Sequence, residues 1–183
     1  MYLRPYFLRT ARLGFGHWTP DDLPLALGLW GDVRVTHLIG GPFSEDQVRQ
    51  RLAMEVANQA AYGIQYWPLF RLADGEHVGC CGLRPYPEGE GMLELGFHIC
   101  YDHWRQGYAL EAAQAVIRHA FGTLHIRSLF AGHHPENEAS RRLLQRLGFR
   151  YTRDEFYPPT GLYHLSYIMT EDNFTVTSLE GRG

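Results

Sequence analysis

The sequence predicts an α/β fold in which one mixed sheet of about seven strands is flanked by about four helices. Some short apolar segments are bounded by turn residues, as in strands, and others repeat at i, i+3 and i+4, as in helices. Their order, β-α-α-β-β-β-α-β-α-β-β, is typical of one sheet covered by helices. The 183 residues are 45% hydrophobic, which is enough for one core. We therefore expect a single domain over residues 1–174 and a flexible tail over residues 175–183.

The N-terminal third of the chain predicts one strand and two helices. Residues 8–18 alternate imperfectly between apolar and polar and form the first strand. Thr19 is a good N-cap, and Pro20 suits the first position of the helix that follows. The second helix begins after the capping box SEDQ at residues 44–47.

The rest of the chain predicts three neighbouring strands and then alternating helices and strands. The three strand segments are IQYWPLFRL, HVGCCGLRPY and MLELGFHICY, and turn-rich ADGE and PEGEG separate them. Residues 108–121 keep helical spacing, and Gly122 ends that helix. The remaining elements are a strand in RSLFAGHH, a helix in ENEASRRLLQRLG, and strands in FRYTRDEFY and LYHLSYIMT.

Composition narrows the class of protein. A formal net charge of −3 offers no basic surplus for nucleic acid or an anionic membrane. The start of the chain lacks the apolar core of a signal peptide, and no run reaches the roughly 18 apolar residues of a membrane span. Cys80, Cys81 and Cys100 form no CxxC pair and are predicted to be free thiols. We expect a soluble cytoplasmic protein that binds neither nucleic acid nor membrane.

Neighbouring histidines do not predict a metal site. His133 and His134 are adjacent on a predicted strand, so their side chains point to opposite faces and do not easily share one ion. We expect no bound metal.

The turn over residues 102–107 is a candidate anion site. It leads from a strand into the helix over residues 108–121, whose first amides have no intrahelical acceptor and lie at the positive end of the helix dipole. Gly107 and Ala109 leave the approach to those amides open. The turn lacks both the GxxxxGK[ST] loop of ATP and GTP sites and the GxGxxG fingerprint of dinucleotide sites, so another pyrophosphate carrier must be considered. Close packing of helix and sheet is the alternative reason for these small residues.

Two motifs in this region resemble a known family. LGFHICYDHWRQGYALEAAQAVIRHAF followed by HPENEASRRLLQRLGF is similar to the core of the GNAT N-acetyltransferase superfamily. The likeness spans about residues 8–170 and is greatest for the RimJ/RimL-type branch, which includes ribosomal-protein N-acetyltransferases. It implies the GNAT fold, with a mostly antiparallel sheet, and acetyl-CoA as co-substrate. A homodimer is consistent with this branch, although no feature of the sequence decides it.

The resemblance implies where the co-substrate binds. The superfamily pattern of Gln or Arg, two residues, Gly, one residue, and Gly or Ala falls on Trp104, Gly107 and Ala109, with Trp104 departing from it. The pantetheine arm would lie beside the strand at His98, and the amide of Ile99 would donate to the thioester carbonyl. Amides of the turn would hold the phosphates; they belong to Arg105, Gln106, Gly107, Tyr108, Ala109 and Leu110.

Asn137 would bond to the pantetheine arm by the same resemblance, with a plain helix N-cap as its alternative role. Arg141, Arg142 and Arg146 form a solvated helix face or meet the 3′-phosphate of coenzyme A.

Glu94 is the candidate general base. Strand alternation puts Glu94 and His98 on one face and Leu95 and Ile99 on the other. Related enzymes use a glutamate here to accept the proton of the amine. His98 is the weaker alternative for that role, and a solvated carboxylate is the structural alternative for Glu94.

Ser140 is the candidate general acid for the departing thiolate, as in some relatives. A small residue needed for helix packing is its structural alternative. Other branches use a tyrosine as the acid, which leaves Tyr151, Tyr163 and Tyr167 open.

The predicted function is direct transfer of an acetyl group from acetyl-CoA to a primary amine, with a protein N-terminal α-amine as one acceptor type. Small-molecule amines, namely antibiotics, polyamines and amino acids, stay open as acceptors, as does another acyl group as the cargo. A non-catalytic acyl-CoA sensor is the competing function. The acceptor would be selected by residues 30–45, 62–68 and 153–166, whose sequence does not indicate which amine binds.

Overall fold

A computed structural model describes residues 4–87 and 91–174. The described chain forms one eight-stranded sheet in the order β1-β2-β3-β4-β5-β6-β8-β7. All neighbouring strands are antiparallel except β5 and β6. The strands are β1 (Leu8–Arg9), β2 (Leu13–Phe15), β3 (Tyr66–Arg71), β4 (His77–Pro85), β5 (Met92–Ile99), β6 (Ser128–His133), β7 (Arg150–Tyr157) and β8 (Leu162–Thr170). The described helices are α1 (Leu23–Trp30), α2 (Val33–Thr36), α3 (Glu45–Tyr62), α4 (Tyr108–Gly122) and α5 (Glu138–Leu147), with 3₁₀ turns η1 (Pro20–Asp22) and η2 (Tyr101–His103).

The α/β prediction is confirmed, with two corrections to its count of elements. The predicted strand over residues 8–18 is two strands, because the chain reverses at Thr10, whose N–H donates to the Leu13 carbonyl at 2.9 Å. The sheet therefore has eight strands rather than seven. The short helix α2 was not predicted; Asp32 begins it by accepting from the Arg34 amide at 2.8 Å. The predicted tail over residues 175–183 lies outside the described residues.

Local signals set the ends of the longer helices. At the start of α3, Gln47 N–H donates to Ser44 Oγ and Ser44 N–H donates to Gln47 Oε1, so the predicted capping box is confirmed. Gly148 ends α5 with a φ of 94°, a left-handed conformation that glycine adopts without strain.

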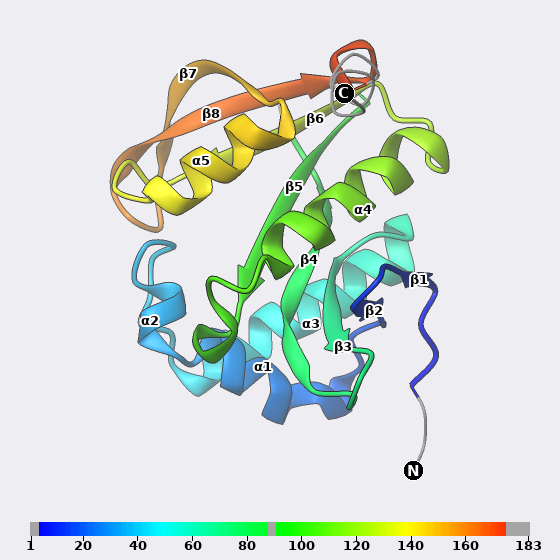
Figure 1. The fold of residues 1–183 in the computed structure, drawn as a ribbon. Helices are drawn as coiled ribbons and strands as arrows, with labels where there is room; N and C mark the ends of the chain where they lie inside the picture. Colours follow the sequence, from blue (N-terminus) through cyan, green and yellow to red (C-terminus); the bar gives the residue numbers. More distant parts are fainter. Residues whose placement is uncertain (1–3, 88–90, 175–183) are drawn as a thin grey trace.

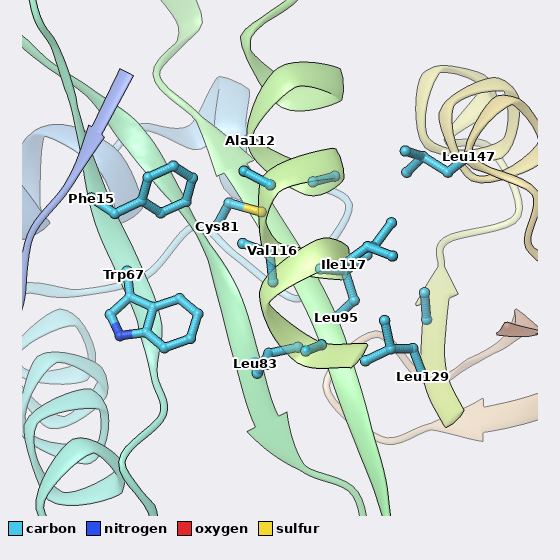
Figure 2. Packing of buried hydrophobic residues seen from close by; sticks show 14 of the residues in the cluster. Phe15, Trp67, Cys81, Leu83, Leu95, Ala112, Val116, Ile117, Leu129 and Leu147 are labelled. Carbon is cyan, nitrogen blue, oxygen red and sulfur yellow. The ribbon is translucent and has the colours of Figure 1, made fainter. Parts of the chain in front are cut away.

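Helices cover both faces of the sheet (Figure 1). The apolar side of α4 packs on the face that carries Trp67, Leu83 and Leu95 (Figure 2). On the opposite face α1 and α3 enclose a second cluster that includes Trp30, Leu52 and Tyr66. Because the residues of β5 alternate between these faces, Leu95 and Ile99 belong to the core under α4, and the side chains of Glu94 and His98 point to the other side.

Within the described residues, no helix is long and apolar enough to cross a membrane. The three cysteines are free thiols, as predicted.

Candidate functional site

The two central strands, β5 and β6, separate after a short paired segment. Residues 92–94 of β5 pair with residues 128–130 of β6, but β5 continues to Ile99 with β4 as the one described strand beside it. β6 continues beside β8 up to His133. The diverging ends leave main-chain donors and acceptors without a neighbouring strand (Figure 1). An extended ligand can add to a sheet in such an opening.

The amide of Ile99 faces this opening. Cys100 N–H donates to the Val78 carbonyl of β4 at 3.0 Å, and successive residues of a strand direct their main-chain groups to opposite sides. The N–H and carbonyl of Ile99 therefore point away from β4. Trp104 Nε1 donates to that carbonyl at 2.8 Å, which ties the turn after β5 to the end of the strand. Trp104 thus holds the turn in place at the position where the superfamily pattern has Gln or Arg.

The turn between β5 and α4 presents main-chain amides in the way the sequence predicts. Glu111 N–H makes the first hydrogen bond of α4, to the Gly107 carbonyl, so the amides of residues 107–110 precede the helical pattern. Arg105 and Gly107 both have positive φ angles, 61° and 79°. Left-handed residues in a turn gather amides into an anion-binding concavity. Arg105 bears this conformation at a cost of roughly 1–2 kcal/mol that a glycine would not incur.

A distant hairpin fixes the turn from its other side, which sequence reasoning missed. Arg12, between β1 and β2, donates from Nη1 to the Gln106 carbonyl at 2.9 Å and from Nε to Glu111 at 2.6 Å. Thr10 Oγ1 donates to the same carboxylate at 2.6 Å. The Arg12 guanidinium also lies over the Tyr108 ring, 4.6 Å from its centroid. Glu111 therefore anchors the hairpin to the turn in addition to complementing the helix dipole.

Replacing Arg12 by methionine is expected to weaken binding of coenzyme A about tenfold, because two charged hydrogen bonds that hold the turn are lost. The dissociation constant, measured by calorimetry, tests this. Arg9→Met is the matched control, since Arg9 lies in the same hairpin with its side chain exposed and lies over the Tyr6 ring rather than the turn. Equal affinities of the two variants would contradict the anchoring role.

A cavity of about 900 Å³ occupies the opening between the strands and extends along both β5 and α5. Of the predicted site residues, the cavity wall includes Glu94, His98, Ile99, Arg105, Gly107, Tyr108, Ala109, Leu110, Asn137 and Ser140. Gln106 is not part of that wall, and its side chain donates to the Asp102 carbonyl at 3.2 Å. The side chain of Tyr108 is packed in the core, so only its main chain is available to a ligand.

Glu94 lies among buried charges. Burial raises the pKa of Glu94, while the Arg84 cation and a hydrogen bond from the Tyr66 hydroxyl act in the opposite direction. Arg84 lies 4.0 Å over the Tyr66 ring and is paired with Glu55, a fully buried carboxylate on α3. A carboxylate with a raised pKa is a stronger proton acceptor, which suits a general base.

His98 is less suited to that role. Trp30 Nε1 donates to His98 Nδ1 at 3.3 Å, so the single lone pair of the neutral ring is occupied and its proton is on Nε2. Burial also lowers the pKa of His98 well below its usual value. The geometry favours Glu94 over His98 as the base.

Asn137 and Ser140 lie together at the start of α5. The Ser140 amide donates to Asn137 Oδ1 at 3.0 Å, so Asn137 is the N-cap of the helix. Capping uses only the oxygen and leaves the Asn137 amide nitrogen free to donate to a ligand, so the two alternatives for this residue are compatible.

The tyrosine alternatives for the acid lie elsewhere. Tyr151 and Tyr163 are 55% and 63% exposed, and Tyr167 is buried with its hydroxyl 3.2 Å from His133 Nε2. None of the three belongs to the cavity wall. On β8, His164 and Ser166 line the cavity, and Tyr163 and Tyr167 alternate with them and point to the other face. Ser140 is the candidate that reaches the cavity.

The residues present fit acetyl-CoA. The open amides of the turn suit a diphosphate, and the unpaired edge of β5 suits the amide-bearing pantetheine arm. The described residues contain no cluster of His, Cys, Asp and Glu that could hold a metal.

Comparisons with known proteins agree with this geometry. A family model described as an acetyltransferase (GNAT) domain matches residues 12–150. The chain is 28% identical over 145 residues to a protein from Bacillus licheniformis described as the uncharacterized N-acetyltransferase p20, a match that covers 78% of this chain and 82% of p20. It is 30% identical over 170 residues to an FsC-acetyl coenzyme A-N(2)-transacetylase from Aspergillus fumigatus, which covers 85% of this chain and 71% of that protein.

The fold is also shared with solved structures. An acetyltransferase from Agrobacterium tumefaciens superposes with a TM-score of 0.79 at 25% identity, over 93% of this chain and 98% of the other. The family match covers most of the sequence and includes the turn, the strand opening and the start of α5. The chain therefore belongs to the GNAT acetyltransferase family and is an N-acetyltransferase.

Proposed function

We propose that this N-acetyltransferase moves an acetyl group directly from acetyl-CoA to a primary amine and belongs to the RimJ/RimL-type branch that its motifs resemble. One observation carries the proposal: the opening between β5 and β6 has bare turn amides at one end and Glu94 in its wall. In this proposal the donor and the base share one cavity, as direct transfer requires. Residues 1–174 would act as one domain.

Main-chain amides and side chains have separate tasks in this proposal. Amides of residues 105–110 hold the diphosphate, while Ile99 N–H and the Asn137 amide bind the acyl end and the pantetheine arm. Bound acetyl-CoA supplies an acyl group that is already activated as a thioester, so no nucleophilic side chain is needed. Glu94 accepts the proton of the amine, and Ser140 returns a proton to the departing sulfur. Burial raises the pKa of Cys100 to about 11, which argues against a thiolate nucleophile there.

An α-amine is easier for the general base to deprotonate than a lysine amine, because its pKa is lower. Deprotonating an α-amine with a pKa of ~7.8 at pH 7 costs roughly 1 kcal/mol, whereas a lysine amine with a pKa of ~10.4 costs roughly 4.6 kcal/mol. A protein N-terminus fits this requirement, and so does a small molecule with an amine of low pKa.

A mass-spectrometric screen of peptides and small primary amines with acetyl-CoA tests the proposal. We expect N-acetylated product from at least one class of acceptor with the wild-type protein, and far less with Glu94→Gln. Binding of acetyl-CoA without transfer to any amine would instead indicate the sensor function.

Replacing Ser140 by alanine is expected to lower kcat about tenfold or more, because the sulfur then leaves without a proton from this side chain. Steady-state rates with the acceptor found in the screen check this. Tyr163→Phe, which removes an exposed hydroxyl outside the cavity wall, should keep the wild-type rate. A Ser140→Ala enzyme as fast as wild type would assign the acid to another group.

A further inference from the structure

One arginine in the cavity wall, whose Nε is buried, has no ion-pair partner among the described residues. The cavity is lined by Arg34, Arg51 and Arg84, and by the exposed Arg105 of the turn before α4. Arg34 pairs with Asp32, and Arg84 pairs with Glu55. In the described parts of the chain Arg51 has neither an ion pair nor a hydrogen bond, and its Nε is fully buried.

The neighbours of Arg51 explain why it stays unpaired. Glu55 lies one turn further along α3, but one carboxylate oxygen binds Arg84 and the other accepts from the Tyr66 amide at 2.8 Å. Aromatic rings surround the Arg51 guanidinium instead, with Trp30 at 4.9 Å and Phe43 at 5.9 Å from ring centroid to Cζ. These rings stabilise a cation but supply no hydrogen-bond acceptor.

A cation held in this way is costly unless an anion pairs with it. Burial lowers the pKa of Arg51, and the nearby Arg84 cation adds to that effect. The guanidinium is planar and offers forked donors that match a carboxylate. Because the side chain lines the cavity, the missing anion can come from a ligand.

Arg51 lies on the acceptor side of the cavity. It belongs to α3, which covers the sheet face opposite to α4 (Figure 1). The turn proposed to bind the diphosphate, residues 102–107, leads into α4 instead. The cluster that encloses Trp30 and Tyr66 is also the one that faces Glu94 and His98. An anion bound to Arg51 would therefore lie near Glu94 and would be distinct from the phosphates of coenzyme A.

Resting on the proposed function, we propose that Arg51 binds a carboxylate of the acceptor, so that the acceptor is a small amine that also carries a carboxylate, as an amino acid does. The forked guanidinium fixes the carboxylate while Glu94 faces the amine. The acceptor is thereby selected for an anionic group beside its amine, and uncharged amines of the same size bind weakly.

Arg51 has a second candidate role, tuning the pKa of Glu94, and this role leads to a different experimental result. Its charge also acts on Glu94 and lowers the pKa of that carboxyl. If tuning of Glu94 were its whole role, loss of Arg51 would change kcat for every acceptor equally and would shift the pH profile. Binding of a carboxylate instead raises KM for carboxylate-bearing acceptors alone.

Arg51→Met keeps an apolar chain against Trp30 and removes the charge. Its matched control is Arg49→Met, since Arg49 lies on the same helix in an exposed pair with Glu45. The acceptors are L-amino acids and their carboxamides, which differ in the carboxylate and, through it, in the pKa of the amine. Because each variant is compared with wild type on the same acceptor, the effect of the amine pKa on KM and affinity cancels. Calorimetric titration of the same acceptors into the protein saturated with coenzyme A, which has no acetyl group to transfer, gives the second readout.

We expect Arg51→Met to raise KM and the dissociation constant of the preferred amino acid about 30-fold or more, and those of its carboxamide less than about threefold. Arg49→Met should change neither. Arg51→Lys, which keeps the charge without the fork, should give an intermediate loss and serves if the methionine variant does not fold. Equal losses for acid and amide, or wild-type preference for carboxamides or neutral peptides, would overturn the carboxylate assignment. In that case transfer itself would persist, whereas failure of the proposed function would show as no acetylation of any amine.

Discussion

Glu94→Gln is expected to lower kcat at least about 100-fold, with little change in the affinity for coenzyme A. Glutamine fills the same space and keeps an acceptor for the Tyr66 hydroxyl, but it does not take up a proton. Wild-type kcat should rise with pH through the raised pKa of Glu94 and then level off. The kcat of the variant should not show this rise. Steady-state rates over pH and calorimetry with coenzyme A measure both effects. A variant that keeps the wild-type rate and pH profile would exclude Glu94 as the base.

The same substitution should not destabilise the protein at neutral pH. Because the pKa of Glu94 is raised in the folded state, its contribution to stability is complete at low pH and is lost as pH rises through that folded-state pKa. Glutamine stays neutral throughout. The Tm of the variant should therefore equal or exceed that of wild type at pH 8. A clear fall in Tm at pH 8 would mean that the carboxylate stabilises the fold.

Glu55→Gln is expected to reduce the free energy of unfolding by about 3–5 kcal/mol, a large part of the stability of a typical domain. Glu55 is fully buried, pairs with Arg84 and accepts the Tyr66 amide. Without the charge of Glu55, Arg84 loses its ion-pair partner in a largely buried position. Urea denaturation followed by circular dichroism measures the loss.

Glu45→Gln is the control for this prediction. Glu45 lies on the same helix and also pairs with an arginine, but both side chains are more than half exposed. Loss of that pair should cost about 0.5 kcal/mol or less. A double variant, Glu55→Leu with Arg84→Met, should recover much of the stability, since apolar residues can replace a buried ion pair. Equal costs for Glu55→Gln and Glu45→Gln would contradict the buried role.

The parts of the fold that the sequence predicts depend on local chemistry. The capping box at Ser44 and the glycine after α5 act within one helical turn, so they can be read from neighbouring residues. The alternation along β5 separates Glu94 from Leu95, and the small residues near Gly107 mark the turn. These features define the turn before α4 and the face of β5 that carries Glu94.

Other contacts in both halves of the site join segments that are distant in sequence, the first at the turn before α4 and the second on the acceptor side. Glu111 binds Arg12 from the first hairpin, and Glu55 binds Arg84 from β4. No local pattern specifies such pairs. One sequence signal was nevertheless present: Arg51 and Glu55 occupy positions beside Val48 and Leu52 on the side of α3 that faces the sheet, where charges are rare unless they serve a purpose.

Binding of coenzyme A through the turn amides tests the central claim most directly. The measurement is calorimetric titration of the protein with acetyl-CoA and with S-acetylpantetheine, which shares the thioester and the arm but has no phosphate. The account predicts one site per chain for acetyl-CoA and an affinity at least about 100-fold lower for the fragment, because the amides of residues 105–110 then have no anion to bind. Equal affinities for the two compounds, or no binding of acetyl-CoA, would contradict it.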